Sequence, residues 1–294
     1  TIGDGVWYSE VFIPWSVAPM KAQSGPNRKV KLGFYRMMAG YSRVFATIQG
    51  SPYQNIYLSA FNDFTFTNYK SSKIDYFPYL TLNEDRLEGE VDNKAGAEIF
   101  WKIDSSRQLN AAFNPDFGQV ESDAVVVNFS ASETFYSDKR PFFSENQNLF
   151  NVQGYRFFYI INTRRIGASP DYNCSEDFSL QQDLCEDAQK GANDIDAAFR
   201  YTQQGENFDV GFLGAFEANE KFSEGKEFYA ARLRTKRDNL TVGYLGTYVN
   251  RPVFNRTAKV NAVDFEYRPS SVRRLSGAVL ASDVNGETGY GLTI

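Results

Sequence analysis

Long segments that alternate apolar and charged side chains constrain the fold of this chain more than any other feature. In the segment 226–239, Tyr229 and Leu233 fall on one face of an extended strand. Arg232 and Arg234 fall on the opposite face. A period of two residues belongs to strands and not to helices. The segment is therefore predicted to be a β-strand with one apolar and one charged face.

The same alternation recurs in 240–249, in 259–268 and in two segments near the C-terminus. The last two carry Leu275 with Val279 and Tyr290 with Leu292. Each segment is about nine to eleven residues long, the length of a tilted strand that crosses a bilayer. The turns between the segments are too short for a parallel crossover. We therefore predict a continuous antiparallel meander after residue 190.

The charged faces separate two all-β architectures that share this period. A soluble sandwich has a core about 10 Å thick, which cannot accept Arg232, Arg234 and Asp264 without partners. An outer-membrane barrel accepts them, because its strands face lipid on one side and a polar interior on the other. The pattern favours an incomplete barrel, and a soluble sandwich or solenoid is the open alternative. The side chains predicted to face lipid are Tyr229, Leu233, Val263, Phe265 and Tyr267.

Composition agrees with two-faced strands and excludes some partners. The chain has 18 Tyr and 26 Phe among 294 residues, yet its mean hydropathy is −0.44. A net charge of −5 and a pI near 5.1 argue against nucleic acid as a partner. No stretch approaches the roughly 18 consecutive apolar residues of a membrane-spanning helix, so a helical membrane protein is excluded.

The residue types present exclude most catalytic arrangements. The chain contains no His, which rules out Ser-His-Asp and Cys-His sites and zinc sites that use His. Glycosidase chemistry needs two carboxylates at a set separation, and nothing in the sequence fixes a separation for Glu121 with Asp123 or for Glu98 with Asp104. We predict a protein with no catalytic residues, no metal and no cofactor.

Two cysteines, Cys174 and Cys185, lie in a polar stretch typical of a loop. A disulfide that closes so short a loop would contribute about 3 kcal/mol. It would place the loop in the periplasm or at the cell surface. We predict the disulfide, with two free thiols as the alternative.

The section up to about Leu82 differs from the rest, because it has shorter strands and more turns. Strands are predicted in 6–15, where Pro14 ends the run, in 28–38, and in 76–82. We interpret this section as the end of a β-sandwich whose earlier strands precede Thr1. Sugar rings stack on aromatic faces, so Trp7, Trp15 and Trp101 are weak candidates for carbohydrate binding, with core or membrane-interface positions as the alternative.

One segment, 113–150, does not alternate and is followed by a related stretch at 157–170. It contains NPDFGQVE with Asp123, the pair Val127 and Asn128, the step from Glu133 to Phe135, and KRPFF, while RRIG follows at 164–167. These elements resemble the signature of a bacterial family of unknown function, DUF5916. In that family a family 9 carbohydrate-binding-like domain precedes an outer-membrane β-barrel.

The resemblance implies two domains, the end of a carbohydrate-binding-like sandwich at 1–85 and a barrel portion at 86–294. The family's sandwich would begin before Thr1, and its barrel would continue past Ile294. The motif residues that the resemblance singles out are Asn114, Pro115, Asp116, Gly118, Glu121, Asp123, Arg140, Pro141, Phe142, Phe143, Arg164 and Arg165.

The signature also has a physical interpretation. Pro141, Phe142 and Phe143 form a bulky apolar wedge, and acidic residues such as Asp138 lie near Arg140 in sequence, so buried ion pairs are expected. We predict that 113–150 folds against the inner barrel wall as a plug. An ordered periplasmic hinge between the two domains is the alternative.

Together these features predict an outer-membrane β-barrel protein, without enzymatic activity, that takes up or handles carbohydrate or other nutrients at the bacterial surface. Its partners would be outer-membrane lipid and possibly carbohydrate, and its N-terminal domain would lie outside the cytoplasm. The alternative is a carbohydrate-binding surface protein or a protein associated with polysaccharide breakdown by glycoside hydrolases.

Overall fold

The computed structural model describes residues 2–3, 6–15, 19–38, 40, 43–48, 57–85, 90–115, 138–152, 159–172, 192–220, 223–270 and 272–294. The fold is almost entirely β, as predicted. Among the described residues, no helix has the length and apolar character needed to span a membrane.

The strands of the first section are β1 (Ile2–Gly3), β2 (Val6–Trp7), β3 (Asn27–Leu32), β4 (Tyr35–Met38), β5 (Arg43–Ala46) and β6 (Asn62–Thr67). The later strands are β7 (Lys73–Asp85), β8 (Glu90–Lys102), β9 (Arg107–Phe113), β10 (Ile195–Gln204), β11 (Phe208–Glu217), β12 (Glu227–Arg237), β13 (Leu240–Arg251), β14 (Arg256–Ser270), β15 (Arg273–Val284) and β16 (Glu287–Thr293). The helical turns are η2 (Tyr57–Ala60), α1 (Pro141–Ser144), η3 (Gln147–Leu149), η4 (Thr163–Arg165) and η5 (Pro252–Phe254).

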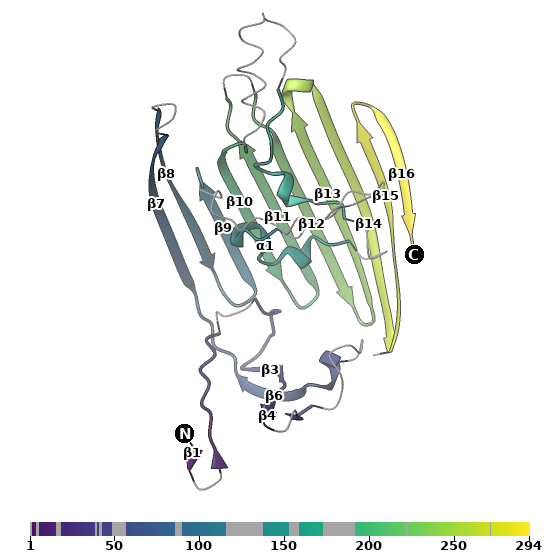
Figure 1. The fold of residues 1–294 in the computed structure, drawn as a ribbon. Helices are drawn as coiled ribbons and strands as arrows, with labels where there is room; N and C mark the ends of the chain where they lie inside the picture. Colours follow the sequence, from purple (N-terminus) through teal and green to yellow (C-terminus); the bar gives the residue numbers. More distant parts are fainter. Residues whose placement is uncertain are drawn as a thin grey trace, which may run out of the picture.

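Ten strands, β7 to β16, form one sheet in the order of the sequence (Figure 1). Every neighbouring pair is antiparallel. The predicted meander after residue 190 is therefore confirmed. The sheet is not closed, because β7 and β16 form its two edges.

The sheet begins earlier than the sequence pattern suggested. Residues 76–82, which we assigned to the first section, lie in β7 and pair with β8 over the whole length of the strand. The predicted boundary at 85/86 therefore falls after the first strand of the sheet. The physical reason is that β7 has the same alternation as later strands, with Ile74, Tyr76 and Leu80 exposed on a single face.

The first section contains three separate pairs of strands, β1 with β2, β3 with β6, and β4 with β5. The predicted strand at 6–15 is limited to β2, and residues 8–14 have no regular structure. A strand needs a partner for its backbone hydrogen bonds, and none of the described residues pairs with 8–14. The predicted strand at 28–38 is divided into β3 and β4. Two-stranded pairs do not define two packed layers, so the sandwich remains a prediction.

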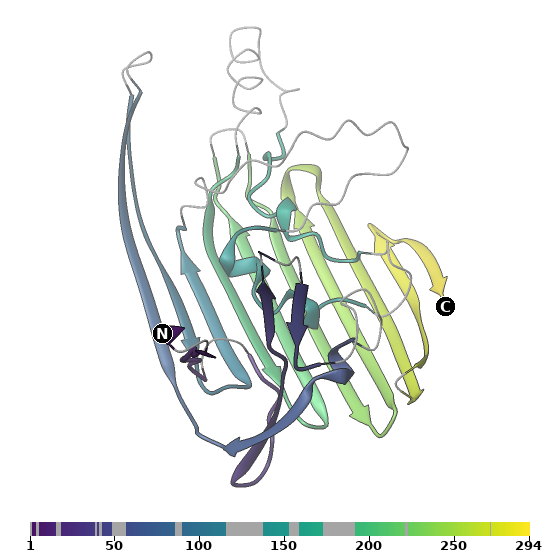
Figure 2. The same cartoon turned by 60° about the horizontal axis from the view of Figure 1, so that its bottom comes forward.

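The first section contacts one end of the sheet, where the turns are short. The backbone N–H of Met20 donates to the Ser105 carbonyl (2.6 Å), and that of Ala22 donates to the Gln204 carbonyl (2.8 Å). The Ser24 hydroxyl donates to the carboxylate of Glu206. Figure 2 shows β3 and β6 near this end of the sheet.

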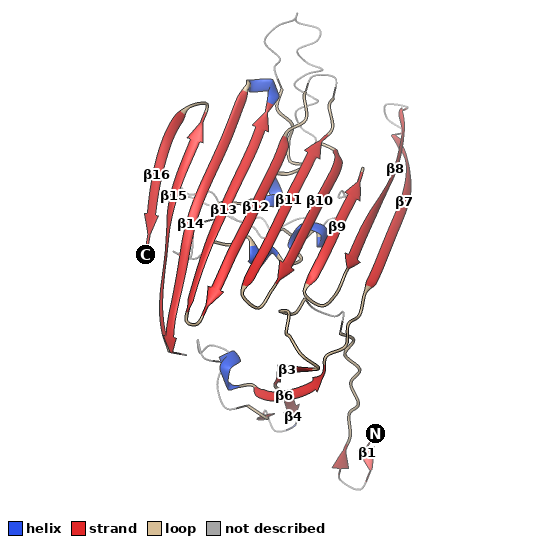
Figure 3. Cartoon of the chain, turned by 180° about the vertical axis from the view of Figure 1, so that it is seen from behind, coloured by secondary structure: helices blue, strands red, loops and turns tan. Residues whose placement is uncertain are grey.

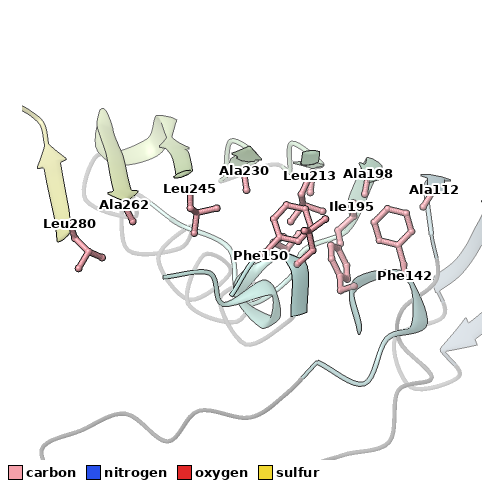
Figure 4. Packing of buried hydrophobic residues seen from close by; sticks show 14 of the residues in the cluster. Ala112, Phe142, Phe150, Ile195, Ala198, Leu213, Ala230, Leu245, Ala262 and Leu280 are labelled. Carbon is pink, nitrogen blue, oxygen red and sulfur yellow. The ribbon is translucent and has the colours of Figure 1, made fainter. Parts of the chain in front are cut away.

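Residues 138–152 and 159–172, here called the covering segment, lie over one face of the sheet (Figure 1). Figure 3 shows the opposite face, which no described element covers. Phe142 and Phe150 of the covering segment point toward small side chains of the strands, such as Ala112 and Ala198 (Figure 4). The buried core of the described chain therefore lies between the covering segment and one face of the sheet.

One glycine of β11 lies in close contact with the covering segment. A Cβ atom at Gly211 would lie 2.9 Å from Cζ of Phe150 and 3.0 Å from Cδ2 of Leu149. We predict that Gly211→Ala lowers the free energy of unfolding by about 1 to 3 kcal/mol, because the covering segment must shift. Gly291→Ala is the matched control, since a Cβ there meets only an ordinary contact with Leu280. Equal stability of the two variants in urea unfolding would contradict this packing.

Candidate functional site on the covered face of the sheet

A buried ion pair joins two strands and the covering segment. The guanidinium of Arg232 in β12 donates to both carboxylate oxygens of Asp264 in β14, at 2.6 and 2.9 Å. Its remaining donors reach the backbone carbonyls of Leu149 (3.1 Å) and Asn151 (3.3 Å). The pair crosses over β13 at Gly243, where a Cβ would lie 2.5 Å from Oδ1 of Asp264. One arginine therefore fixes both the sheet and its cover.

A second buried carboxylate lies nearby, on β11. Asp209 accepts from Nη2 of Arg234 (2.5 Å) and from Nζ of Lys236 (2.5 Å). Both cations come from β12, which is the neighbouring strand. The charged row that the sequence placed on one face of β12 therefore finds its partners on the same face of the sheet.

Arg140 connects the two described parts of the covering segment. Its guanidinium donates to both carboxylate oxygens of Asp138, at 2.9 and 2.7 Å. It also donates to the carbonyls of Thr163 (2.7 Å) and Ile166 (2.8 Å) and stacks 4.3 Å above the ring of Phe143. The KRPFF and RRIG elements, which are separated in sequence, are thus held together by one side chain.

Arg200 of β10 lies beneath the helical turn α1. Its guanidinium carbon is 5.6 Å from the ring centre of Phe142, and Nη2 is 4.0 Å from the carboxylate of Glu145. The same carboxylate accepts from Nε2 of Gln108 in β9 at 2.6 Å. The beginning of the covering segment is therefore attached to β9 and β10 by a polar network.

The end of the covering segment is attached to β11 through Glu217. This carboxylate accepts from the backbone N–H of Gly167 (2.9 Å) and from Nδ2 of Asn193 (3.1 Å). It also forms an ion pair with Lys226 (3.4 Å). Nζ of Lys226 in turn donates to the Ser169 carbonyl (3.0 Å). Each described part of the covering segment therefore has its own charged anchor on the sheet.

A further pair ties the covering segment to β13. Arg251 donates through two nitrogens to the carboxylate of Asp171, at 2.7 and 2.6 Å. The bidentate geometry fixes the orientation of both groups.

The structure brings together only part of the predicted motif. Arg140, Pro141, Phe142 and Phe143 lie in the buried contact described above. Arg164 and Arg165 belong to η4, and the carbonyls that Arg140 contacts are those of Thr163 in η4 and of Ile166 just after it. Asn114 and Pro115 follow β9, and Asn114 has a left-handed φ of 44°. The predicted residues that lie outside the described part of the chain are Asp116, Gly118, Glu121, Asp123 and both members of the predicted disulfide, Cys174 and Cys185.

The structure describes the side chains of two of the three candidate tryptophans, Trp15 and Trp101. The Trp15 ring contacts Phe66 edge to face, and the Arg28 guanidinium lies 5.9 Å from its centre. Trp101 lies in β8, and its Nε1 donates to Ser72. Trp7 lies in β2, and its side chain is outside the description. Their role in carbohydrate binding remains a prediction.

Sequence reasoning missed several residues of this site, among them Arg200, Asp209 and Glu217. Each lies on the covered face of its strand, opposite apolar neighbours. In β11 the alternation of Phe208 and Phe212 with Asp209 follows the same rule that identified Arg232. Applying the same two-residue alternation to β10 and β11 would have found these residues.

The geometry of the covered face favours attachment over catalysis. Its carboxylates are engaged by arginine, lysine or backbone N–H groups. Within the described ranges, no group of three or more acidic or cysteine side chains could hold a metal ion. Of the carboxylates weighed for glycosidase chemistry, Asp104 lies in the turn after β8 and accepts from Ser106 and Arg107.

Removal of Arg232 tests the ion pair. We predict that Arg232→Met lowers the free energy of unfolding by about 3 to 5 kcal/mol, because Asp264 remains buried without its partner. The double variant with Asp264→Leu should recover part of this loss, since no uncompensated charge remains. Asp63→Asn, which breaks an exposed pair with Lys31, should cost less than about 1 kcal/mol in the same urea unfolding experiment. A single variant as stable as wild type would refute the anchor.

Acid should weaken the attachment through Asp138. Burial alone would raise its pKa, but the hydrogen bonds and charge of Arg140 outweigh burial and hold the pKa below its usual value. The carboxylate therefore contributes stability that is fully present above the unfolded-state pKa of about 3.9 and is lost as pH falls through the folded-state pKa.

The corresponding measurement is urea unfolding as a function of pH. Wild type should be more stable than Asp138→Asn above about pH 4, and the two stability curves should converge in more acidic solution. Parallel curves across this range would show that Asp138 does not supply the acid-sensitive contact.

Comparison with known proteins identifies the family but gives no precedent for function. The family model described as a domain of unknown function, DUF5916, matches residues 71–241, which is more than half of the chain. No curated protein and no solved structure matches the chain. The matched residues include the whole covering segment and strands β7 to β12. The chain therefore belongs to the DUF5916 family.

Proposed function

We propose that the chain forms part of the wall and the plug of a bacterial outer-membrane β-barrel that takes up a polar nutrient, such as a carbohydrate. The sheet would face lipid with its uncovered face and a polar interior with its covered face. The covering segment would occupy that interior as a constriction.

The inverted burial of the sheet carries this proposal. Leu233 and Val263 on the uncovered face are each 53% exposed, whereas Arg232 and Asp264 on the covered face are 1% and 2% exposed. A soluble sheet covered on one side buries its apolar side chains beneath the cover. Here leucines such as Leu213 and Leu245 are buried under the cover beside the charges, while the exposed large apolar side chains lie together on the bare face, in the arrangement of strands that face lipid.

The border of the exposed apolar band supports the same proposal. Residues that are partners on successive strands form a row across the sheet. In one such row the residue of β10 is the polar Gln203, whereas the residue of β14 is the apolar Val263. A second row lies nearer the other end of the strands. There the residue of β10 is the apolar Phe199, whereas β14 has the charged Lys259 and β15 has the charged Asp283. The band therefore crosses the strands obliquely. Tilted strands that pass through a hydrocarbon layer of constant thickness require this shift.

The connections between strands support an orientation for the barrel. At one end the turns are short, as at 103–106 and 205–207, whereas the other end has both short turns, as at 285–286, and the long connection 114–194 between β9 and β10. Outer-membrane barrels have short turns on the periplasmic side. Since the first section contacts Ser105 and Gln204 at the short turns, we place it in the periplasm.

A polar nutrient fits the character of the covered face. Strands β9 to β12 present Gln108, Thr202 and the Arg232 row on this side, and these groups can bind hydroxyl groups if the covering segment moves. The covering segment is held by buried apolar contacts as well as by ion pairs and hydrogen bonds, and water can replace the polar contacts. Uptake would thus require displacement of the plug from these anchors.

Charge placed on the uncovered face distinguishes lipid from water as its neighbour. In phospholipid vesicles, Val263→Arg should lower the free energy of unfolding by about 2 to 4 kcal/mol, because the charge would lie in hydrocarbon. Val272→Arg is the matched control, because Val272 is 73% exposed in the turn between β14 and β15, and its effect should stay within about 0.5 kcal/mol.

The opposite result would be equally clear. In a soluble protein, the 53% exposed Val263 faces water, and its replacement by Arg would be neutral. Monodisperse wild-type protein without detergent, together with a neutral Val263→Arg variant, would refute a lipid-facing wall.

A further inference from the structure

A small cavity lies between the covering segment and strands β10 and β11. Its volume is about 10 Å³, which is room for one group of the size of a water molecule. Phe150 and Leu213 contribute apolar walls, and Arg200 lines the cavity from β10. The polar side chains that line it from the covering segment include Gln147 and Asn151. The cavity therefore lies between a cation of the sheet and amide groups of the cover.

Arg200 is buried without a full set of acceptors. Its side chain is 3% exposed. Nη2 donates to Oδ1 of Asn110 at 2.8 Å when that amide is oriented with its oxygen toward the guanidinium. The Glu145 carboxylate is 4.0 Å from the same nitrogen, which is too far for a hydrogen bond. Nη1 makes no hydrogen bond to any residue that the structure describes. A buried donor of a charged group is costly to leave without an acceptor.

The charge of Arg200 is also only partly compensated. Glu145 is shared with Lys102, whose Nζ lies 3.8 Å from its carboxylate. Asp138, the other carboxylate that acts on Arg200, is already paired with Arg140. Burial lowers the pKa of Arg200 to about 10, although both carboxylates oppose this shift. The region around the cavity therefore carries an excess of positive charge.

The covering segment offers hydrogen-bond donors at the mouth of the cavity. Within the described ranges, the carboxamides of Gln147 and Asn151 have no hydrogen-bond partner. Each carboxamide has an NH₂ group that can donate to an anion. Asn151 is exposed and Gln147 is partly exposed, so rotation of these side chains can widen the mouth for a group slightly larger than water. The small volume excludes a phosphate or carboxylate ligand.

We propose that this cavity binds one monatomic anion, chloride, between β10 and the covering segment. The ion accepts from Nη1 of Arg200 and from the carboxamide of Gln147. A water molecule would satisfy the same donor but would leave the buried positive charge uncompensated. Bound chloride therefore strengthens the attachment of the cover to the sheet. This inference goes beyond the proposed function and does not require the sheet to lie in a membrane.

Urea unfolding of the full chain tests the site when chloride is replaced stepwise by gluconate, an anion too large for the cavity, at constant ionic strength. An ion that binds only the folded chain lowers the unfolding equilibrium constant by the factor 1 + [Cl⁻]/Kd. Above Kd, each tenfold increase in chloride should therefore lower this constant tenfold. Arg200→Met should abolish the dependence, and Gln147→Leu should raise Kd about tenfold, the effect of losing one hydrogen bond to a charged group.

A control variant separates the site from a general effect of salt. Arg268→Gln removes a cation of β14 whose side chain is 57% exposed, so its response to chloride should equal that of wild type. Equal unfolding of wild type in chloride and in gluconate would overturn the proposal. A chloride response that persists unchanged in both Arg200→Met and Gln147→Leu would overturn it as well.

A second measurement locates the ion in the wild-type chain and so does not depend on the folding of Arg200→Met. Crystals of the full chain soaked in sodium bromide should give an anomalous-scattering peak beside Nη1 of Arg200, because bromide replaces chloride. Bromide peaks confined to exposed side chains, with a water molecule in the cavity, would show that the site takes water and would refute the anion.

Discussion

The ion pair between Arg232 and Asp264 sets the constraint on which the rest of the structure depends. Two charges can be buried on one face of a sheet only if they meet in good geometry and their remaining hydrogen-bonding groups are satisfied. Here the two side chains meet across β13, and the backbone of the covering segment satisfies the spare donors of the arginine. The cover is thus part of the solution to charge burial. Without it, Arg232 would lose two of its acceptors.

The small residues of the covered face follow from the same requirement. Alanines at 112, 198 and 230 leave depth for the phenylalanines of the covering segment, and Gly243 leaves a path for the ion pair. Strand side chains such as Leu213, Leu245 and Leu280 also join this core, whereas the exposed large apolar side chains of β10 to β15 lie on the opposite face. The covered face of the sheet therefore combines buried charges, small residues and a few leucines, and the other face carries the exposed large apolar side chains.

The sequence predicted the strands and their faces because the two-residue alternation of apolar and charged side chains depends only on neighbouring residues of the chain. It placed Arg232, Arg234 and Asp264 on one face and predicted the meander, and both agree with the structure. It did not predict which charges pair, because pairing depends on strand register, and register is set by turns and packing far apart in sequence. The partners of Arg140 were hidden for another reason. They are backbone carbonyls, which every residue carries.

The errors in the first section have a complementary cause. Residues 8–14 have a strand-like composition but no partner among the described residues, and the exposed Phe12 packs into no core there. Alternation predicts which side chains of a strand would share a face. It does not show whether another strand is present to pair with it. At β7 the reverse happened, because a partner exists although 76–82 was grouped with the shorter strands before it. Local pattern and long-range pairing must agree before a segment becomes a strand of a sheet.

The anchors also explain why the KRPFF and RRIG elements stand out from the strands. A strand of this sheet needs only the correct alternation, and many residues of similar character satisfy it. The covering segment has stricter requirements, because Arg140 must reach Asp138 and two carbonyls while it stacks on Phe143. A lysine could not make these contacts, since it lacks the planar fork of donors. The part of the sequence that stands out is therefore the part in which the fewest other residue types could make the same contacts.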